Sequence, residues 1–381
     1  PGNFVNFETP HVHPIDISPN GSTLAVCNTP DGRVEIYSIN GVSGQLTHAD
    51  TVPVGYDPVT ARFRTNNELW VVNQISDSVS VVNVSTGVVT ATIDTDDEPA
   101  DVVFFTDAGN AAPLAAVSCS RPDLIQIFHA TTHALVDQFT IMSQDPRALA
   151  TDGTNVFVAP FASGNSTTII PNNTIGDALQ DATGPYGGQN PPFNNGIPGT
   201  AWVTPLGSDD FGTIFAPPPQ VGLIVRKDSG GAWLDDNGAD WTDWISGSKS
   251  AMSLRVAGWD LTDNDIASFR TTNGTSSLNA GFGTAGWVTR RMTTGMALAR
   301  NPTTGSVMLV GTEATNEIRF EPNIEGTFVR VLVAIANGTT GAEIAVTDMN
   351  EEHLDAAQSG VGTAYQDGHV LQAERDKSIG D

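Results

Sequence analysis

The segment Trp233–Trp244 (WLDDNGADWTDW) contains the densest group of side chains that could do chemistry. Asp235, Asn237 and Asp240 place oxygen ligands on both sides of a glycine, as calcium-binding loops do. The spacing departs from that of an EF-hand, and no glutamate closes the loop. These three residues are therefore a candidate calcium site, with a plain acidic hairpin as the alternative.

Three tryptophans, Trp233, Trp241 and Trp244, lie in the same segment, and most of the chain's tryptophans fall between Trp202 and Trp287. Exposed aromatic rings beside carboxylates suit sugar or protein recognition, because a large ring gives much contact area at little entropic cost. We predict that these three residues contact a ligand or partner. The alternative is that they fill a core.

Other reactive groups are sparse. His11 and His13 alternate, so on a strand they would share one side and could begin a metal site, although an ordinary entry loop explains them equally well. Cys27 and Cys119 lie in different repeats and form neither CxxC nor CxxCH, so we expect free thiols and no covalent haem. Since linear catalytic motifs are missing, an enzyme would need side chains that converge from separate strands.

The charge balance narrows the classes of partner. The 381 residues include 43 acidic and 17 basic side chains, for a formal net charge of −26. Phosphate binding requires lysine and arginine, so nucleic acid and anionic membrane surfaces are not expected as partners. No apolar run is long enough to predict a membrane span. A surface so short of bases favours cations or basic partners.

A repeat organises the elements that would position these residues. Pro14, Pro58, Pro99 and Pro146 each open an apolar strand, and they are 44, 41 and 47 residues apart. In the second unit a strand over 69–73 (LWVVN), a polar turn, a strand over 79–83 (VSVVN) and a strand over 88–93 follow. Four short strands in about 40 residues are typical of a propeller blade.

We therefore predict an all-β fold: a single β-propeller domain over residues 1–381 with four antiparallel strands per blade. Seven blades are expected, with six as the alternative. A long proline- and glycine-rich loop insertion over 171–250 is expected after the fourth blade. The C-terminal segment 336–381 is expected to complete the last blade with an N-terminal strand, because an open ring would expose sheet edges.

The second unit also carries a family resemblance. WVVN at Trp70–Asn73, followed by SDSVSVVNVSTGVV at Ser76–Val89, resembles the YVTN-type propeller repeat of bacterial and archaeal secreted or surface proteins. Residues 222–241 and 301–322 resemble segments of larger bacterial relatives, in which the propeller is often joined to a c-type haem domain. The resemblance implies an extracytoplasmic location: periplasmic, cell-surface or secreted. It also allows a haem-domain partner in a longer parent chain.

The predicted function is a non-catalytic binding or scaffold module for a protein, a glycan or a redox partner, with the partner on the loop face. One alternative is a propeller enzyme, a hydrolase or oxidoreductase, with a metal at the central channel. Another is the propeller portion of a larger electron-transfer protein. The sequence contains no motif that decides among these three.

Overall fold

Short antiparallel strands form most of the regular structure in the computed structural model, which describes residues 10–187, 222–235, 238–260, 262–314 and 329–349. The first three sheets consist of consecutive strands: β1 (Ile15–Ile17), β2 (Thr23–Asn28), β3 (Arg33–Ile39) and β4 (Leu46–Pro53); β5 (Pro58–Phe63), β6 (Glu68–Asn73), β7 (Ser78–Asn83) and β8 (Val88–Asp94); β9 (Pro99–Thr106), β10 (Pro113–Cys119), β11 (Leu124–His129) and β12 (Leu135–Thr140). The strands predicted in the second repeat are confirmed to within one residue at each end.

The fourth sheet is interrupted. Its first two strands are β13 (Gln144–Thr151) and β14 (Asn155–Ala162), whereas its outer strands β18 (Ile266–Thr272) and β19 (Thr275–Leu278) come about a hundred residues later. The short β20 (Trp287–Val288) also pairs with β18. The insertion therefore lies inside the fourth sheet, between its second and third strands, rather than after it.

The fifth sheet consists of β21 (Thr294–Arg300), β22 (Val307–Ala314), β23 (Val329–Ala336) and β24 (Glu343–Asp348). A single backbone register pair, Ala162 with Thr294, joins it to the fourth sheet. β23 is the third strand of this sheet. Of the segment 336–381, only the part up to residue 349 is described, and it supplies the fourth strand.

Consecutive sheets stack face to face, and each contact is a separate apolar cluster. One cluster joins the first and second sheets, the next joins the second and third, another joins the third and fourth, and the last joins the fourth and fifth. Neighbouring residues of a strand point to opposite faces, so Leu69 packs toward the first sheet while Trp70 packs toward the third. This alternation is why the inner strands read as continuous apolar runs.

A repeated polar contact braces neighbouring sheets. The carboxylate of Asp77, in the turn between β6 and β7, accepts a hydrogen bond from the backbone N–H of Glu98, which precedes Pro99. Asp123 makes the same contact with Asp145, which precedes Pro146. All four residues have positive φ angles between 47° and 58°. Each brace thus holds the strand-opening proline of one sheet against a turn of the preceding sheet.

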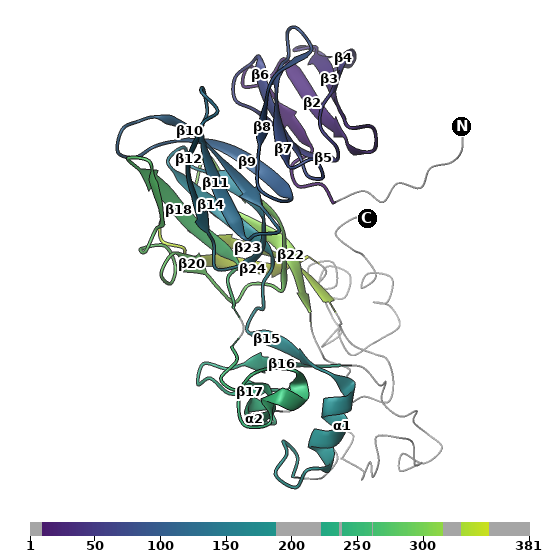
Figure 1. The fold of residues 1–381 in the computed structure, drawn as a ribbon, viewed down its shortest axis with the longest axis vertical. Helices are drawn as coiled ribbons and strands as arrows, with labels where there is room; N and C mark the ends of the chain where they lie inside the picture. Colours follow the sequence, from purple (N-terminus) through teal and green to yellow (C-terminus); the bar gives the residue numbers. More distant parts are fainter. Residues whose placement is uncertain (1–9, 188–221, 236–237, 261, 315–328, 350–381) are drawn as a thin grey trace, which may run out of the picture.

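The described part of the insertion has its own core and projects as a separate lobe from one end of the sheets (Figure 1). Its elements are β15 (Thr167–Ile170), β16 (Leu223–Lys227), β17 (Trp233–Leu234), α1 (Asn172–Gln180) and α2 (Thr242–Ile245). A short 3-10 helix at Ser250–Ser253 also belongs to the lobe, and another, at Thr29–Asp31, lies between β2 and β3 of the first sheet. The expected plain loop is therefore wrong for these residues. Tryptophan and isoleucine side chains supply enough apolar area to form a small core.

The helices of the described chain are all short. None of them is long and apolar enough to cross a membrane. Residues 254–260 contain no strand, and β18 begins at Ile266.

Candidate functional site

A cavity of about 500 Å³ lies where the insertion meets the fifth sheet. The insertion contributes β15 and β16, the link from β20 to β21 contributes Arg290, and the fifth sheet contributes the end of β22 and the start of β23. Four basic side chains line it, against three acidic ones: Arg226, Lys227, Arg290 and Arg330, against Asp228, Asp235 and Glu313. In a chain with 17 bases and 43 acids, this is a locally basic surface. We call it the arginine cleft.

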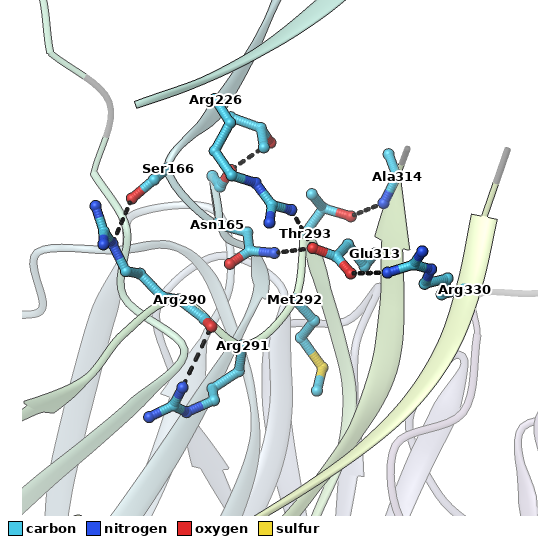
Figure 2. Close-up of polar contacts among 12 residues, drawn as sticks. Asn165, Ser166, Arg226, Arg290, Arg291, Met292, Thr293, Glu313, Ala314 and Arg330 are labelled. Carbon is cyan, nitrogen blue, oxygen red and sulfur yellow. Dashed lines mark hydrogen bonds and ion pairs between the residues drawn. The ribbon is translucent and has the colours of Figure 1, made fainter. Parts of the chain in front are cut away.

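Glu313 is the acidic centre of the arginine cleft (Figure 2). Arg226 forms an ion pair with one carboxylate oxygen, and Asn165 Nδ2 donates to the same oxygen at 2.8 Å. Arg330 Nη1 lies 3.9 Å from the other oxygen. The side chain of Glu313 is 10% exposed, whereas that of Arg226 is 55% exposed. Arg330 Nε also lies 3.9 Å from Asp348 Oδ2, so the two guanidinium groups are paired with two largely buried carboxylates, and the more exposed Arg226 faces the cleft.

Arg290 lies on the other side of the cleft, where its backbone N–H donates to Asp263 Oδ1 at 2.9 Å and its guanidinium group bonds neutral acceptors. Its Nε donates to Ser166 Oγ at 3.3 Å, and its Nη2 donates to the carbonyls of Lys227 and Asp228. Three of its five N–H donors are thus used, and the two on Nη1 remain. The Arg290 guanidinium group therefore has donors to offer, and the carboxylate near it, Asp263, bonds the hydroxyl of Ser166.

Three residues around the cleft have left-handed backbone conformations. The φ angles are 45° at Asn165, 53° at Ser166 and 63° at Arg290. A residue with a Cβ rarely adopts such angles, and they occur most often where the surroundings hold a functional group in place. The backbone is thus bent where it presents these side chains to the cleft.

A second cavity, of about 710 Å³, adjoins the first and shares Thr167, Ile224 and Ala314 with it. Its basic residue is Arg255, which donates to the carbonyls of Ser253 and Ile169 and to Thr168 Oγ1. The Arg255 guanidinium also lies over the ring of Trp259, 4.7 Å from its centroid. In the described residues, the guanidinium group of Arg255 bonds only neutral acceptors.

A buried carboxyl group lies behind the cleft. Asp265, 1% exposed, accepts hydrogen bonds from the backbone N–H of Arg291 at 2.7 Å and of Met292 at 3.4 Å. Burial, reinforced by the negative charge of Asp263, raises the pKa of Asp265 to about 7, against the opposing effect of these N–H donors. Asp265 lies where the chain returns from the insertion into β18.

The predicted calcium ligands are only partly described. Asp235 uses its oxygens within the lobe: Oδ1 accepts from the N–H of Ala239, and Oδ2 accepts from Trp241 Nε1 and the hydroxyl of Tyr186. Asp240 Oδ1 accepts from the N–H of Thr242 at the start of α2. Asn237 lies outside the described residues. These contacts give both aspartates a structural role, and the calcium site stays a prediction.

The predicted binding tryptophans lie in the core of the lobe. Trp233, Trp241 and Trp244 are 1%, 0% and 2% exposed. They pack with the aliphatic side chains of the lobe, namely Ile170, Ile175, Leu179, Leu223, Val225 and Ile245. The structure thus corrects the expectation that these rings are exposed, and it leaves Trp259 partly exposed at the second cavity.

The remaining candidates are also embedded in structure. His11 Nε2 bonds Thr29 Oγ1 at 2.6 Å. His13 pairs with Thr60 of β5, and burial followed by the charge of Arg62 lowers the pKa of His13. Cys27 and Cys119 are free and buried, in different clusters, and burial raises the pKa of each to about 12.

Sequence reasoning missed the arginine cleft. A signal was present, because Arg226–Lys227 and Arg290–Arg291 are adjacent basic pairs in a base-poor chain. Nothing in the sequence showed that these pairs meet each other and Arg330.

Comparison with known proteins bears on the fold. The model of a family described as Lactonase, 7-bladed beta-propeller, matches residues 5–177. A search of curated proteins finds no match. Among solved structures, Kuenenia stuttgartiensis hydrazine synthase is similar, with a TM-score of 0.50 and 14% identity, covering 91% of this chain and 69% of that chain. The chain is a β-propeller. Its described residues form five blades, and the seven-bladed family model agrees with the predicted blade number.

Proposed function

We propose that this β-propeller is a non-catalytic binding module that holds an anionic group of its partner in the arginine cleft. The observation that carries the proposal is the convergence of four basic side chains from three separate parts of a chain whose net charge is −26. Arginine presents a planar fork of donors that fits carboxylates and other oxyanions.

The overall charge and the cleft act over different distances. Exposed charges are screened beyond about 10 Å at 0.1 M salt, so most of the 43 acidic groups have little effect at the cleft. Within the cleft, hydrogen bonds from Arg290 and Arg226 to an anion act at contact distance. The cleft therefore suits a short anionic group, while a long polyanion such as nucleic acid would also meet the acidic remainder of the surface.

The resemblance to secreted YVTN-type proteins supports an extracytoplasmic location and, as a wider proposal, a protein, glycan or redox partner, including a haem-domain protein. Detection of the natural protein outside the cytoplasm by cell fractionation tests the location. Recovery of a haem-containing protein with the purified natural complex would support the proposal of a redox partner.

Citrate is a suitable probe for the proposed binding, measured by isothermal titration calorimetry at pH 7. A charge-assisted hydrogen bond contributes about 1.5–3 kcal/mol, so Arg290→Gln should weaken citrate binding by about ten-fold or more. Glu313→Gln should strengthen binding, because it removes the carboxylate paired with Arg226, whereas Arg330 keeps Asp348. Arg270→Gln, at an exposed position on β18, is the matched control. The proposal fails if citrate does not bind, or if Arg290→Gln and Arg270→Gln bind citrate with equal affinity.

A second candidate, lactone hydrolysis, is favoured by the name of the matching family model. That match ends at residue 177, so it covers the first three blades, the first two strands of the fourth and β15, but little of the cleft. In those blades the buried carboxylate Asp101 is held by Arg62 and by the N–H of Leu149, an arrangement that leaves it poorly suited to act as a base.

Hydrolysis of glucono-δ-lactone, followed with a pH indicator, tests this second candidate. A rate above that of buffer and of heat-denatured protein, unchanged in Arg290→Gln, would favour the hydrolase over the binding module. A rate equal to buffer would count against it.

A further inference from the structure

The second cavity has an apolar wall that the lobe supplies. Ile169 of β15 stands directly opposite Ile224 of β16, and both residues line the cavity. Residues that face each other across an antiparallel pair lie on the same side of the sheet, so Ile169 and Ile224 share the outer face of this hairpin. Their neighbours Ile170 and Leu223 point the other way, into the core of the lobe. The hairpin thus presents two aliphatic side chains to the cavity, and Ile169 is 58% exposed.

The blades supply a more polar wall to the same cavity. It includes Ala162 and Thr294, at the point where β14 pairs with β21, and Ser143, in the link that precedes β13. Asn264, on the chain that returns from the insertion, also lines the cavity and donates to the carbonyl of Met142. Hydroxyl and amide groups can both donate and accept hydrogen bonds, so this wall suits a ligand that carries hydroxyl groups.

Ser143 supplies the observation that points to a ligand. The residue is 7% exposed, and its Oγ has no hydrogen-bond partner in the described chain. Its backbone N–H, by contrast, donates to the carbonyl of Ile141. A buried hydroxyl without a partner costs free energy in the unbound protein, and a polar group of a ligand would recover that cost.

Arg255 brings a partly buried positive charge to the cavity, and burial lowers its pKa. Three of its guanidinium N–H groups bond Thr168 Oγ1 and the carbonyls of Ser253 and Ile169. Within the described chain, one N–H on Nε and one on Nη1 are left. The acidic residue of the same lining, Asp260, is paired with Lys227 Nζ at 2.6 Å. An anionic group in the cavity would therefore meet a guanidinium group with two donors to offer.

We propose that the second cavity binds a uronic acid unit of an acidic glycan, with the carboxylate on Arg255 and a ring hydroxyl on Ser143. A pyranose ring has hydroxyl groups at its edge and C–H groups on its faces, which matches a polar wall joined to the apolar wall of Ile169 and Ile224. The volume of about 710 Å³ lies within the range of about 300–1,000 Å³ that is typical of small-molecule sites. This inference goes beyond the proposed function, because it concerns a different cavity and different side chains.

The lining fits a uronate better than a phosphorylated ligand. One guanidinium group matches the single negative charge of a carboxylate, whereas a phosphate monoester carries about −1.5 to −2 at neutral pH and would be left partly uncompensated. Trp259 also lines the cavity and is half-buried, with the Arg255 guanidinium 4.7 Å from its ring centroid. An aromatic ring offers a flat apolar surface, which can contact the C–H groups of a sugar.

The test is isothermal titration calorimetry at pH 7 with digalacturonate and with galactobiose, the neutral disaccharide that has CH₂OH in place of each carboxylate. We expect digalacturonate to bind and galactobiose to bind at least about ten-fold more weakly, because the charge-assisted hydrogen bonds are lost. Arg255→Gln should weaken digalacturonate binding by a similar factor, and Arg255→Lys should recover part of the loss. Arg33→Gln and Arg270→Gln, at exposed arginines of other sheets, are the matched controls and should bind as the unaltered protein does.

Ser143→Ala separates binding from folding. Removal of a hydroxyl that has no partner should leave the melting temperature unchanged or higher, while digalacturonate binding weakens by about five-fold through the loss of one hydrogen bond. The inference is overturned if digalacturonate does not bind, if galactobiose binds equally well, or if Ser143→Ala and Arg255→Gln both fold and both bind digalacturonate unchanged.

The same variants separate this inference from the proposed function. Digalacturonate binding that is lost in Arg290→Gln but kept in Arg255→Gln would place the sugar acid in the arginine cleft and overturn this inference alone. If citrate does not bind while digalacturonate binding depends on Arg255 and Ser143, the proposed function alone is overturned. Tighter binding of a Glu-Glu dipeptide than of digalacturonate, lost in Arg255→Gln, would replace the glycan with an acidic peptide and so overturn the inference.

Discussion

Asp265 should make the stability of the protein depend on pH, and the size of the effect follows from its pKa. The pKa is raised from 3.8 to about 7 in the folded protein by burial and by the charge of Asp263. An acid with a higher pKa in the folded state binds its proton more tightly there, so folding is favoured at low pH. Stability then falls as the pH rises from about 3.8 to about 7 and levels off above that.

One pKa unit corresponds to 1.36 kcal/mol, so the full effect is about 4 kcal/mol, of which about 3 kcal/mol falls between pH 5 and pH 8. Asp265→Asn keeps a carbonyl oxygen to accept from the N–H of Arg291 but has no charge to bury. The free energy of unfolding of the unaltered protein, relative to that of Asp265→Asn, should therefore fall by about 3 kcal/mol between pH 5 and pH 8.

The assay is urea unfolding at half-unit pH steps for both proteins. Taking the difference between them removes the effect of the other carboxylates, including the general repulsion within a chain of net charge −26. Asp263→Asn is an informative third protein, because loss of the neighbouring charge should make the decline smaller. If the curves of the unaltered protein and Asp265→Asn run parallel from pH 5 to pH 8, the reasoning is refuted.

Three further outcomes test the fold. Asp107 accepts backbone hydrogen bonds from two hairpins; burial would raise its pKa, but these N–H donors lower it on balance. Asp107→Ala should therefore lower the free energy of unfolding by about 3 kcal/mol at pH 7, with a smaller loss below pH 4; an unchanged urea midpoint would contradict this. Asp77→Ala should cost about 1 kcal/mol by removing the brace to the next blade, as a shift in the urea midpoint would show. Cys27 and Cys119 should react with a disulfide reagent at pH 8 only after unfolding, and rapid reaction of the native protein would argue against their burial.

The blades could be predicted because their signals are local. The proline spacing and the apolar alternation in 69–73 and 79–83 depend on neighbouring residues, and they led to the strands that the structure contains. The fourth blade was harder, because β14 pairs with β18 across about a hundred residues of insertion. No local pattern shows which strand returns to complete a sheet.

The exposure of the tryptophans was mispredicted because residue type was taken as a sign of exposure. Trp233 and Trp241 stand in an acidic segment, which suggested a surface, yet the lobe needs these rings as its core. The arginine cleft depends on contacts such as that between Asn165 and Glu313, which are 148 residues apart. Contacts of that range follow from the packing of the blades and the lobe.

The sequence by itself determined the repeating blade, the surplus of acidic groups and the presence of a large insertion, because periodicity and composition act through neighbouring residues. Only the tertiary structure decided that the insertion splits the fourth blade, that its tryptophans are buried and that scattered bases meet in one cleft. The physical reason is that a strand pattern specifies which face is apolar, whereas the partner of that face is set by the free energy of packing the whole chain.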